Sequence, residues 1–272
     1  MATAADTIGI ERRTGGFTAF ADRWIYVFMA ALFIATVFAG FIPDSIGKMG
    51  AVAAGKRPPF PMILHVHAVL MGGWLLLLFT QAVLMATGKS GAHKQLGLTA
   101  MVLAPALIVV GFLLVPAMDG QVIDGIRHGP PPVADELRKL LPIVLDIMAV
   151  QIRVGVVFAI LIVIGLAARR TDPGVHKRLM FLATSAALPA ATDRISWLPT
   201  TMPGSALTVD LWPLVVIAPM FLWDLYRQRS VHRAYWIWFA VSLIPAIAMH
   251  LAWNQPWWHK AALTILGAPE LS

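Results

Sequence analysis

Two histidines within apolar stretches are the residues of this sequence whose chemistry is easiest to recognise. His67 lies near the start of one long apolar stretch, and His250 lies near the end of another. Neutral imidazole is the usual protein ligand of haem iron and of copper, zinc or non-haem iron. Arg153 and Arg194 lie within apolar stretches too, and arginine pairs well with carboxylates such as haem propionates. These residues predict a b-type haem held by the two histidines, with the two arginines as further cofactor-binding residues.

Two carboxylates allow a metal site as the alternative. Asp146 and Arg153 are seven residues apart, so on a helix they share one face. Asp193 lies near the end of another apolar stretch. Added to His67 and His250, either aspartate would complete a site for copper, zinc or non-haem iron. An ion pair between Arg153 and one of these aspartates, serving assembly alone, is the purely structural interpretation.

The neighbouring histidine, His65, has a different environment from His67. Residues two apart on a helix point about 200° away from each other, so the two histidines do not share one metal. His65 could bind a second neighbour, support His67 from an adjacent helix or reach the lipid interface. His67 begins a stripe in steps of four and three residues that continues through Met71, Trp74, Leu78 and Gln81. His67 is therefore the inward-facing candidate.

Long apolar helices must position these residues. The chain of 272 residues is 58% hydrophobic and only 13% charged, with a mean hydropathy of +0.75. Its apolar blocks have the length needed to cross about 30 Å of hydrocarbon. The sequence predicts an all-α integral membrane bundle of seven transmembrane helices, at about 24–42, 62–86, 96–118, 142–168, 179–198, 208–226 and 234–254.

The predicted spans form one domain, 24–254, between an N-terminal tail, 1–23, and a C-terminal tail, 255–272. The first span is expected to be retained, because no small-residue cleavage site follows it. The fifth span carries an aspartate and an arginine near its end, so a short or re-entrant helix and six crossings are the alternative. Residues 133–141, before the fourth span, are amphipathic and are predicted to lie on the membrane surface.

The distribution of basic residues predicts the orientation. The N-terminal tail and the segments 87–95, 169–178 and 227–233 hold twelve Lys and Arg residues, against seven in the other loops and the C-terminus. By the positive-inside rule, the N-terminus is cytoplasmic and the C-terminus periplasmic in a bacterial inner membrane. The formal charge of +7 therefore reflects topology and lipid contact, and nucleic-acid binding is not expected.

Three histidines at the predicted inner helix starts have a simple explanation. His93, His176 and His232 each neighbour a lysine or arginine where lipid head groups are within reach. A second, inner cofactor held by the three is the alternative. The sequence has no cysteine, which excludes disulfides, iron–sulfur clusters and thiolate ligands.

One stretch carries a family resemblance. Between His65 and Gly97 the sequence has His-Val-His, Trp74, Gln81 and then His93-Lys94-Gln95-Leu96-Gly97. This resembles uncharacterised bacterial polytopic membrane proteins that pair a helix histidine with a downstream His-Arg-x-Leu-Gly, with Lys94 here in place of arginine. Haem binding is suspected in those families. The stretch also loosely resembles membrane b-type cytochromes, but it lacks their paired histidines on one helix, so the resemblance implies one haem at most.

Three functions remain open from the sequence. The first is an outward-facing redox or electron-transfer protein with a haem or metal, supplied with electrons by quinol. The second is a proton-linked or small-solute transporter, in which the same charges line a path helped by Pro213, Pro219 and Pro245. The third is an accessory or assembly subunit of a larger membrane complex with no cofactor. No zinc-protease motif, P-loop or nucleophile elbow is present, and the sequence does not decide whether the chain is an enzyme.

Overall fold

The computed structural model describes residues 4–272, with side chains from residue 16 onward, and within these residues all regular structure is helical. Among the described residues, six helices are long and apolar enough to span a membrane. They are α1 (Ala4–Ala53), α2 (Met62–Ala86), α4 (Ala100–His128), α5 (Pro131–Ala168), α8 (Leu207–Gln228) and α9 (Arg233–Ala252). The short α3 (Ser90–Leu96) and a 3₁₀ turn (Gly97–Thr99) lead directly into α4.

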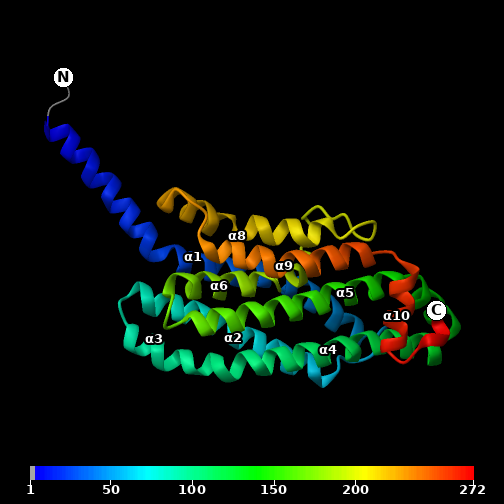
Figure 1. Ribbon diagram of the computed structural model, residues 1–272. Coiled ribbons are helices and arrows are strands. Elements are labelled where there is room, and N and C mark those ends of the chain that lie inside the picture. The colour runs from blue at the N-terminus through cyan, green and yellow to red at the C-terminus, as the bar shows by residue number, and fades with distance from the viewer. Residues whose placement is uncertain (1–3) are drawn as a thin grey trace.

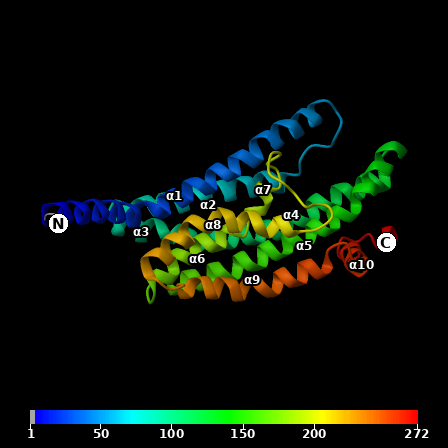
Figure 2. The same cartoon turned by 90° about the horizontal axis from the view of Figure 1, so that it is seen from above.

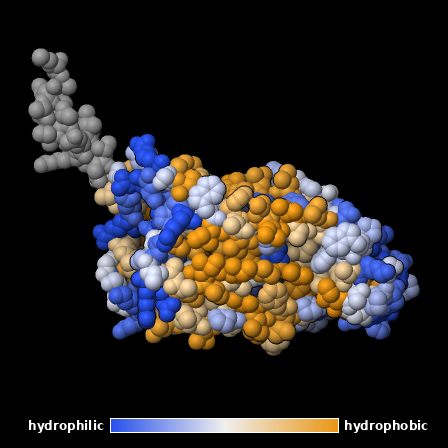
Figure 3. Space-filling view, viewed as in Figure 1, coloured by the Kyte–Doolittle hydropathy of each residue, from blue (hydrophilic) through white to orange (hydrophobic). Residues whose placement is uncertain are grey.

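Apolar side chains cover the outside of the bundle as well as its core. Figure 3 shows an apolar belt between two more polar ends. Val69 on α2, Val102 on α4 and Ile244 on α9 are exposed by 75%, 74% and 74%. Water would disfavour such a surface, whereas hydrocarbon accepts it. The chain is therefore a multi-pass membrane protein, and its surroundings are a lipid bilayer.

Polar contacts between helix ends define the two ends of the bundle. At one end, Nε of Arg227 on α8 lies 3.0 Å from Oδ1 of Asp22 on α1. We call this the inner end, following the predicted orientation. At the opposite, outer end, Nε of Arg194 lies 3.2 Å from Oδ2 of Asp44 on α1. Figure 1 shows the long helices running side by side between these ends.

The fifth predicted span is a broken helix. It consists of α6 (Pro173–Ser185), a turn at 186–188 and α7 (Pro189–Thr192). Pro189 explains the break, because it has no N–H to donate to the carbonyl of Ser185 and its ring would clash there. Tighter turns satisfy the backbone instead, and the N–H of Leu188 donates to the carbonyl of Ser185 at 3.1 Å.

The broken segment nevertheless connects the two ends of the bundle. Asp172, directly before α6, pairs with Arg233 at the start of α9, while Arg194 follows α7 at the outer end. α6 is deeply buried, with Leu179 and Leu182 at 0% exposure. Residues 173–195 thus pass through the middle of the bundle. They do not form one long apolar helix, as each of the six candidate spans does.

Contact between α7 and α1 is close at Gly40. A Cβ atom at this position would overlap the carbonyl oxygen of Ala191. We expect Gly40→Val to lower the free energy of unfolding by about 1–3 kcal/mol, because backbone atoms must move apart. Thermal unfolding in detergent measures the effect. Gly47→Val on the same helix is the matched control, since a Cβ there meets nothing within 4 Å; equal melting temperatures of the two variants would contradict this packing.

Residues 133–141 do not lie along the membrane surface as a separate element. They belong to α5, which runs without interruption through Pro142. The helix tolerates this proline inside its length, and its 38 residues extend for about 57 Å. Because hydrocarbon is only about 30 Å thick, α5 is longer than one crossing requires.

The predicted C-terminal tail contains a helix, α10 (Pro256–Ile265), and a 3₁₀ turn (Pro269–Leu271). Ala262 and Leu263 of α10 are buried in a cluster with Leu141 of α5. Arg127 of α4 donates to Glu270, with Nε 2.9 Å from Oε1, and this hydrogen bond lowers the pKa of the carboxyl group. Figures 1 and 2 show α10 lying across the outer ends of α4 and α5.

Candidate functional site at the outer end

Asp210 in the first turn of α8 joins three helices. Its carboxylate pairs with Arg153 of α5, and its Oδ2 lies 2.8 Å from Nε2 of His250 on α9. Arg153 is 16% exposed and Asp210 25% exposed, so the pair is largely shielded from the surroundings. A carboxylate is also favoured at the N-terminus of a helix by the backbone dipole. We call Arg153, Asp210 and His250 the outer triad.

A second carboxylate and imidazole pair lies two turns away on α5. Asp146 is fully buried, and its Oδ1 lies 2.9 Å from Nε2 of His259 on α10. The backbone N–H of Asn254 donates to the same oxygen at 3.1 Å. Beside it, Nε1 of Trp258 donates to the carbonyl of Leu145 at 2.8 Å. These contacts fix α10 on α5.

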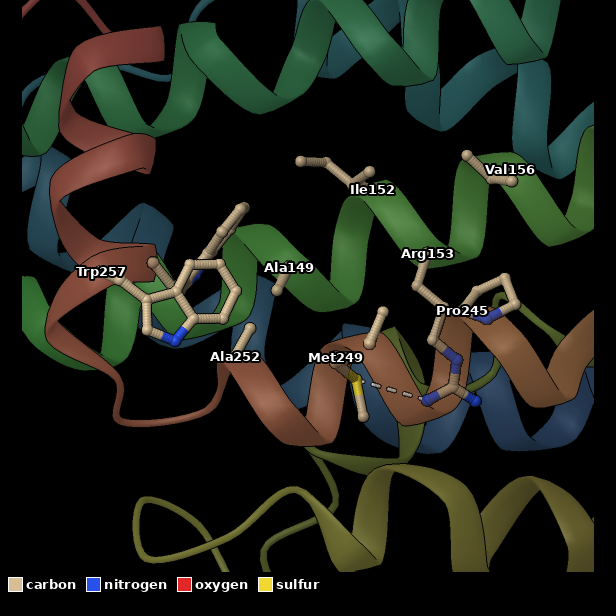
Figure 4. Close-up of a pocket in the computed structure, with 10 residues that line it drawn as sticks. Ala149, Ile152, Arg153, Val156, Pro245, Met249, Ala252 and Trp257 are labelled. Atoms are coloured by element: carbon tan, nitrogen blue, oxygen red, sulfur yellow. Dashed lines mark hydrogen bonds between the residues drawn. The ribbon is translucent and has the colours of Figure 1, made fainter.

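A groove of about 240 Å³ lies between the outer triad and α10. Its walls are mainly apolar, and its lining residues are Ala149, Ile152, Arg153, Val156, Pro245, Ala248, Met249, Ala252, Trp257 and Trp258. Figure 4 shows Arg153 extending from α5 toward Met249 of α9, whose sulfur lies 3.3 Å from Nη1. The groove therefore combines an apolar wall with one guanidinium group.

Arg153 does not pair with either of the aspartates expected from the sequence. Asp146 binds the α10 histidine, and Asp193 is exposed in the turn after α7. Arg194 pairs with Asp44 and stacks over Phe41 at 4.7 Å. The partner of Arg153 is Asp210, in the first turn of α8.

His67 and His250 are not brought together. Nδ1 of His67 is buried without a hydrogen-bond partner, and Cε1 of the ring faces α4 at Gly111. His250 instead engages Asp210, and in both ribbon views α5 lies between α2 and α9 (Figures 1 and 2). His65 is exposed, with the edge of its ring toward Phe60.

These positions do not fit a haem held between His67 and His250, because the two imidazoles face different helices and Nε2 of His250 is already engaged. Three or more His, Asp or Glu side chains arranged to hold a metal ion do not occur in the part of the chain that the structure describes.

A buried polar cluster at the inner end was not predicted. Nε of Arg178 on α6 lies 2.7 Å from Oδ2 of Asp224 on α8, and the hydroxyl of Tyr235 on α9 donates to the same oxygen at 2.6 Å. The side chains of Arg178 and Asp224 are only 7% and 9% exposed. We call these three residues the inner cluster. The sequence signal for this cluster was Asp224, an aspartate inside the predicted apolar span 208–226.

Two of the three inner histidines, His176 and His232, make local contacts with the backbone. Nδ1 of His176 lies 2.8 Å from the carbonyl oxygen of Gly165, and Nδ1 of His232 accepts from the N–H of Ala234 at the start of α9. Partial burial lowers the pKa of His232, so the neutral ring that can accept this bond is favoured. Nδ1 of the third, His93, is buried without a hydrogen-bond partner, so the interpretation of the inner histidines stays a prediction.

His259 was missed because it falls in the predicted tail. The usable signal was Pro256, which suits the first turn of a helix, followed by two tryptophans. We expect His259→Ala to loosen α10 and to cost about 1–3 kcal/mol, because buried Asp146 loses a partner. Hydrogen exchange of residues 256–265 measures the loss of protection. His128→Ala, at an exposed helix end, is the control; unchanged protection in His259→Ala would contradict the proposed anchoring.

Comparison with known proteins gives no further assignment: no family model, no curated protein and no solved structure matches this chain.

Proposed function

We propose that this chain is a proton-linked transporter of the bacterial inner membrane with seven crossings, in which residues 173–195 form the fifth. The observation that carries the proposal is the placement of two shielded carboxylates on α8. Asp210 belongs to the outer triad and Asp224 to the inner cluster. They are fourteen residues apart, or about 21 Å along the helix, which is most of the way across the hydrocarbon.

Each carboxylate has the same kind of surroundings. An arginine from a central helix neutralises it, and α9 supplies a side chain that hydrogen-bonds to it, His250 outside and Tyr235 inside. Intramembrane charges that are shielded and paired in this way are typical of proton and ion pathways. A proton path must cross both leaflets, so it needs polar side chains in the inner half of the bundle as well. The inner cluster supplies them.

Prolines add polar backbone groups between the two carboxylates. Pro213 and Pro219 lie inside α8, and Pro245 lies inside α9. Each proline leaves the carbonyl four residues earlier without its usual helical N–H partner. Such carbonyls can hold water in the apolar middle of the bundle, where side chains offer little hydrogen bonding.

Proton flux tests the proposal. The protein is reconstituted into liposomes that enclose the pH-sensitive dye pyranine, and the outside is acidified in the presence of a small organic monocarboxylate. We expect proton uptake above that of protein-free liposomes, and Asp210→Asn should reduce it to the protein-free level because the site can no longer exchange a proton. Asp135→Asn, which removes an exposed ion pair with Arg138, should leave the flux unchanged.

Two outcomes would reject this function. Flux in Asp210→Asn equal to that of the original protein would show that the outer triad is not on the path. Flux no greater than in protein-free liposomes would favour the accessory-subunit interpretation. An absorption spectrum of the same preparation, before and after reduction, tests the haem hypothesis: a Soret band that weakens in His67→Ala would restore it.

A further inference from the structure

The groove beside the outer triad has the chemistry of a ligand site. Ten residues line it, and Arg153 is the one charged side chain among them. The other walls are aliphatic or sulfur-containing side chains of α5 and α9, with the indole rings of Trp257 and Trp258 at the α10 end. A volume of about 240 Å³ lies just below the range of about 300–1,000 Å³ that is usual for drug-sized ligands. The occupant should therefore be small and mostly apolar.

Arg153 faces two competing partners. Its guanidinium is paired with Asp210, yet it also lines the groove. A carboxylate and a ligand anion compete for the same guanidinium, because both need its hydrogen-bond donors. When Asp210 takes up a proton, it loses its charge and frees Arg153 for the ligand. Proton binding and anion binding are therefore coupled, and each favours the other.

We propose that this groove binds a small amphipathic organic anion, with its carboxylate on Arg153 and its apolar body against Met249 and the two tryptophans. The proposal rests on the proposed transport function and names its substrate class: a lipophilic monocarboxylate that is taken up together with a proton on Asp210. No covalent bond is made or broken, and the proton returns to water when the anion leaves.

The charged groups around Asp210 are few. Arg153 faces it from α5 and His250 from α9. Asp146 and His259 are paired with each other two turns further along α5. The outer charges of α1 and of the segment after α7, Asp44 and Arg194, form their own ion pair. Asp210 is thus the carboxylate that competes directly for Arg153.

Binding of 2-naphthoate to the full chain in lipid nanodiscs tests the proposal. Isothermal titration calorimetry measures the binding at neutral pH. The matched neutral probe is 2-naphthylmethanol. We expect naphthoate to bind to the original protein and the alcohol to bind only weakly. Asp210→Asn should bind naphthoate about ten- to a hundredfold more tightly, because no carboxylate then competes for Arg153.

A groove-filling variant keeps the test independent of the charges. Ala248→Phe places a ring in the groove while leaving the outer triad intact, and should abolish naphthoate binding. Ile247→Phe, one residue earlier and half exposed toward lipid, is the control and should bind normally. Because Ala248 is exposed, the larger side chain does not disturb the core.

The outcomes separate this inference from the transport function. Absent binding, or binding unchanged in both Ala248→Phe and Asp210→Asn, overturns the anion site even if proton flux is observed. Tight binding of the alcohol overturns the assignment of an anion. Binding with the expected response but without proton flux supports the anion site and rejects transport.

Discussion

Replacing Arg178 with methionine is expected to lower the free energy of unfolding by about 3–5 kcal/mol, because it leaves buried Asp224 without a cation. Both side chains are less than 10% exposed, so no solvent can replace the lost partner. The hydroxyl of Tyr235 and the side-chain amide of Gln228 remain on the carboxylate, but two neutral hydrogen bonds do not compensate for an ion pair with two hydrogen bonds. This is the largest effect of a single charge that we expect in the chain.

Chemical unfolding in one detergent measures this effect. The double variant Arg178→Met with Asp224→Leu should recover much of the loss, because it removes both charges and keeps the volume apolar. Arg138→Met breaks an exposed pair with Asp135 and should change the free energy of unfolding by less than about 1 kcal/mol. If Arg178→Met were as stable as Arg138→Met, the inner cluster could not be the shielded ion pair described here.

The second large effect is expected at Trp74 in the middle of α2. Its side chain is 1% exposed and packs edge to face on Phe158 of α5, with ring centroids 5.4 Å apart. Its Nε1 donates to the hydroxyl of Thr184 on α6 at 3.0 Å. Trp74→Ala therefore removes a buried ring and leaves a cavity where three helices meet, at a cost of about 3–5 kcal/mol.

Two further tryptophan variants separate packing from hydrogen bonding. Trp74→Phe keeps part of the ring and loses the donor, so its melting temperature should lie between those of the original protein and Trp74→Ala. Trp236→Ala on α9 removes a ring that is 61% exposed and should have a small effect. Similar losses in Trp236→Ala and Trp74→Ala would show that Trp74 does not hold the helices together.

Composition and periodicity were enough to predict the membrane helices. The predicted span 62–86 coincides with α2, because its apolar run is bounded by Pro61 and by the polar turn after Ala86. The stripe through Trp74 and Leu78 is buried as expected. The broken fifth segment and α10 were not predicted as such, since tertiary contacts hold both of them in place: α6 by buried packing and the inner cluster, and α10 by the pair of Asp146 with His259.

The candidate site was predicted only in part. The outer end does collect Arg153, Asp146 and His250, as the distribution of polar residues indicated. Which of them touch depends on how neighbouring helices pack, and a single sequence does not show which helices are neighbours. Arg153 pairs with a residue 57 positions away, and His67 faces α4 instead of α9. The orientation and the number of crossings stay predictions.

The inner cluster also bears on how the protein is made. Arg178 and Asp224 are 46 residues apart in sequence, so the arginine leaves the ribosome well before its partner. At about 5–20 residues per second, that interval is about 2–9 s. A charged segment without its counter-ion does not enter lipid readily. During biosynthesis, residues 173–195 must therefore wait at the insertion machinery or at the membrane surface until α8 emerges, and the two are expected to insert together.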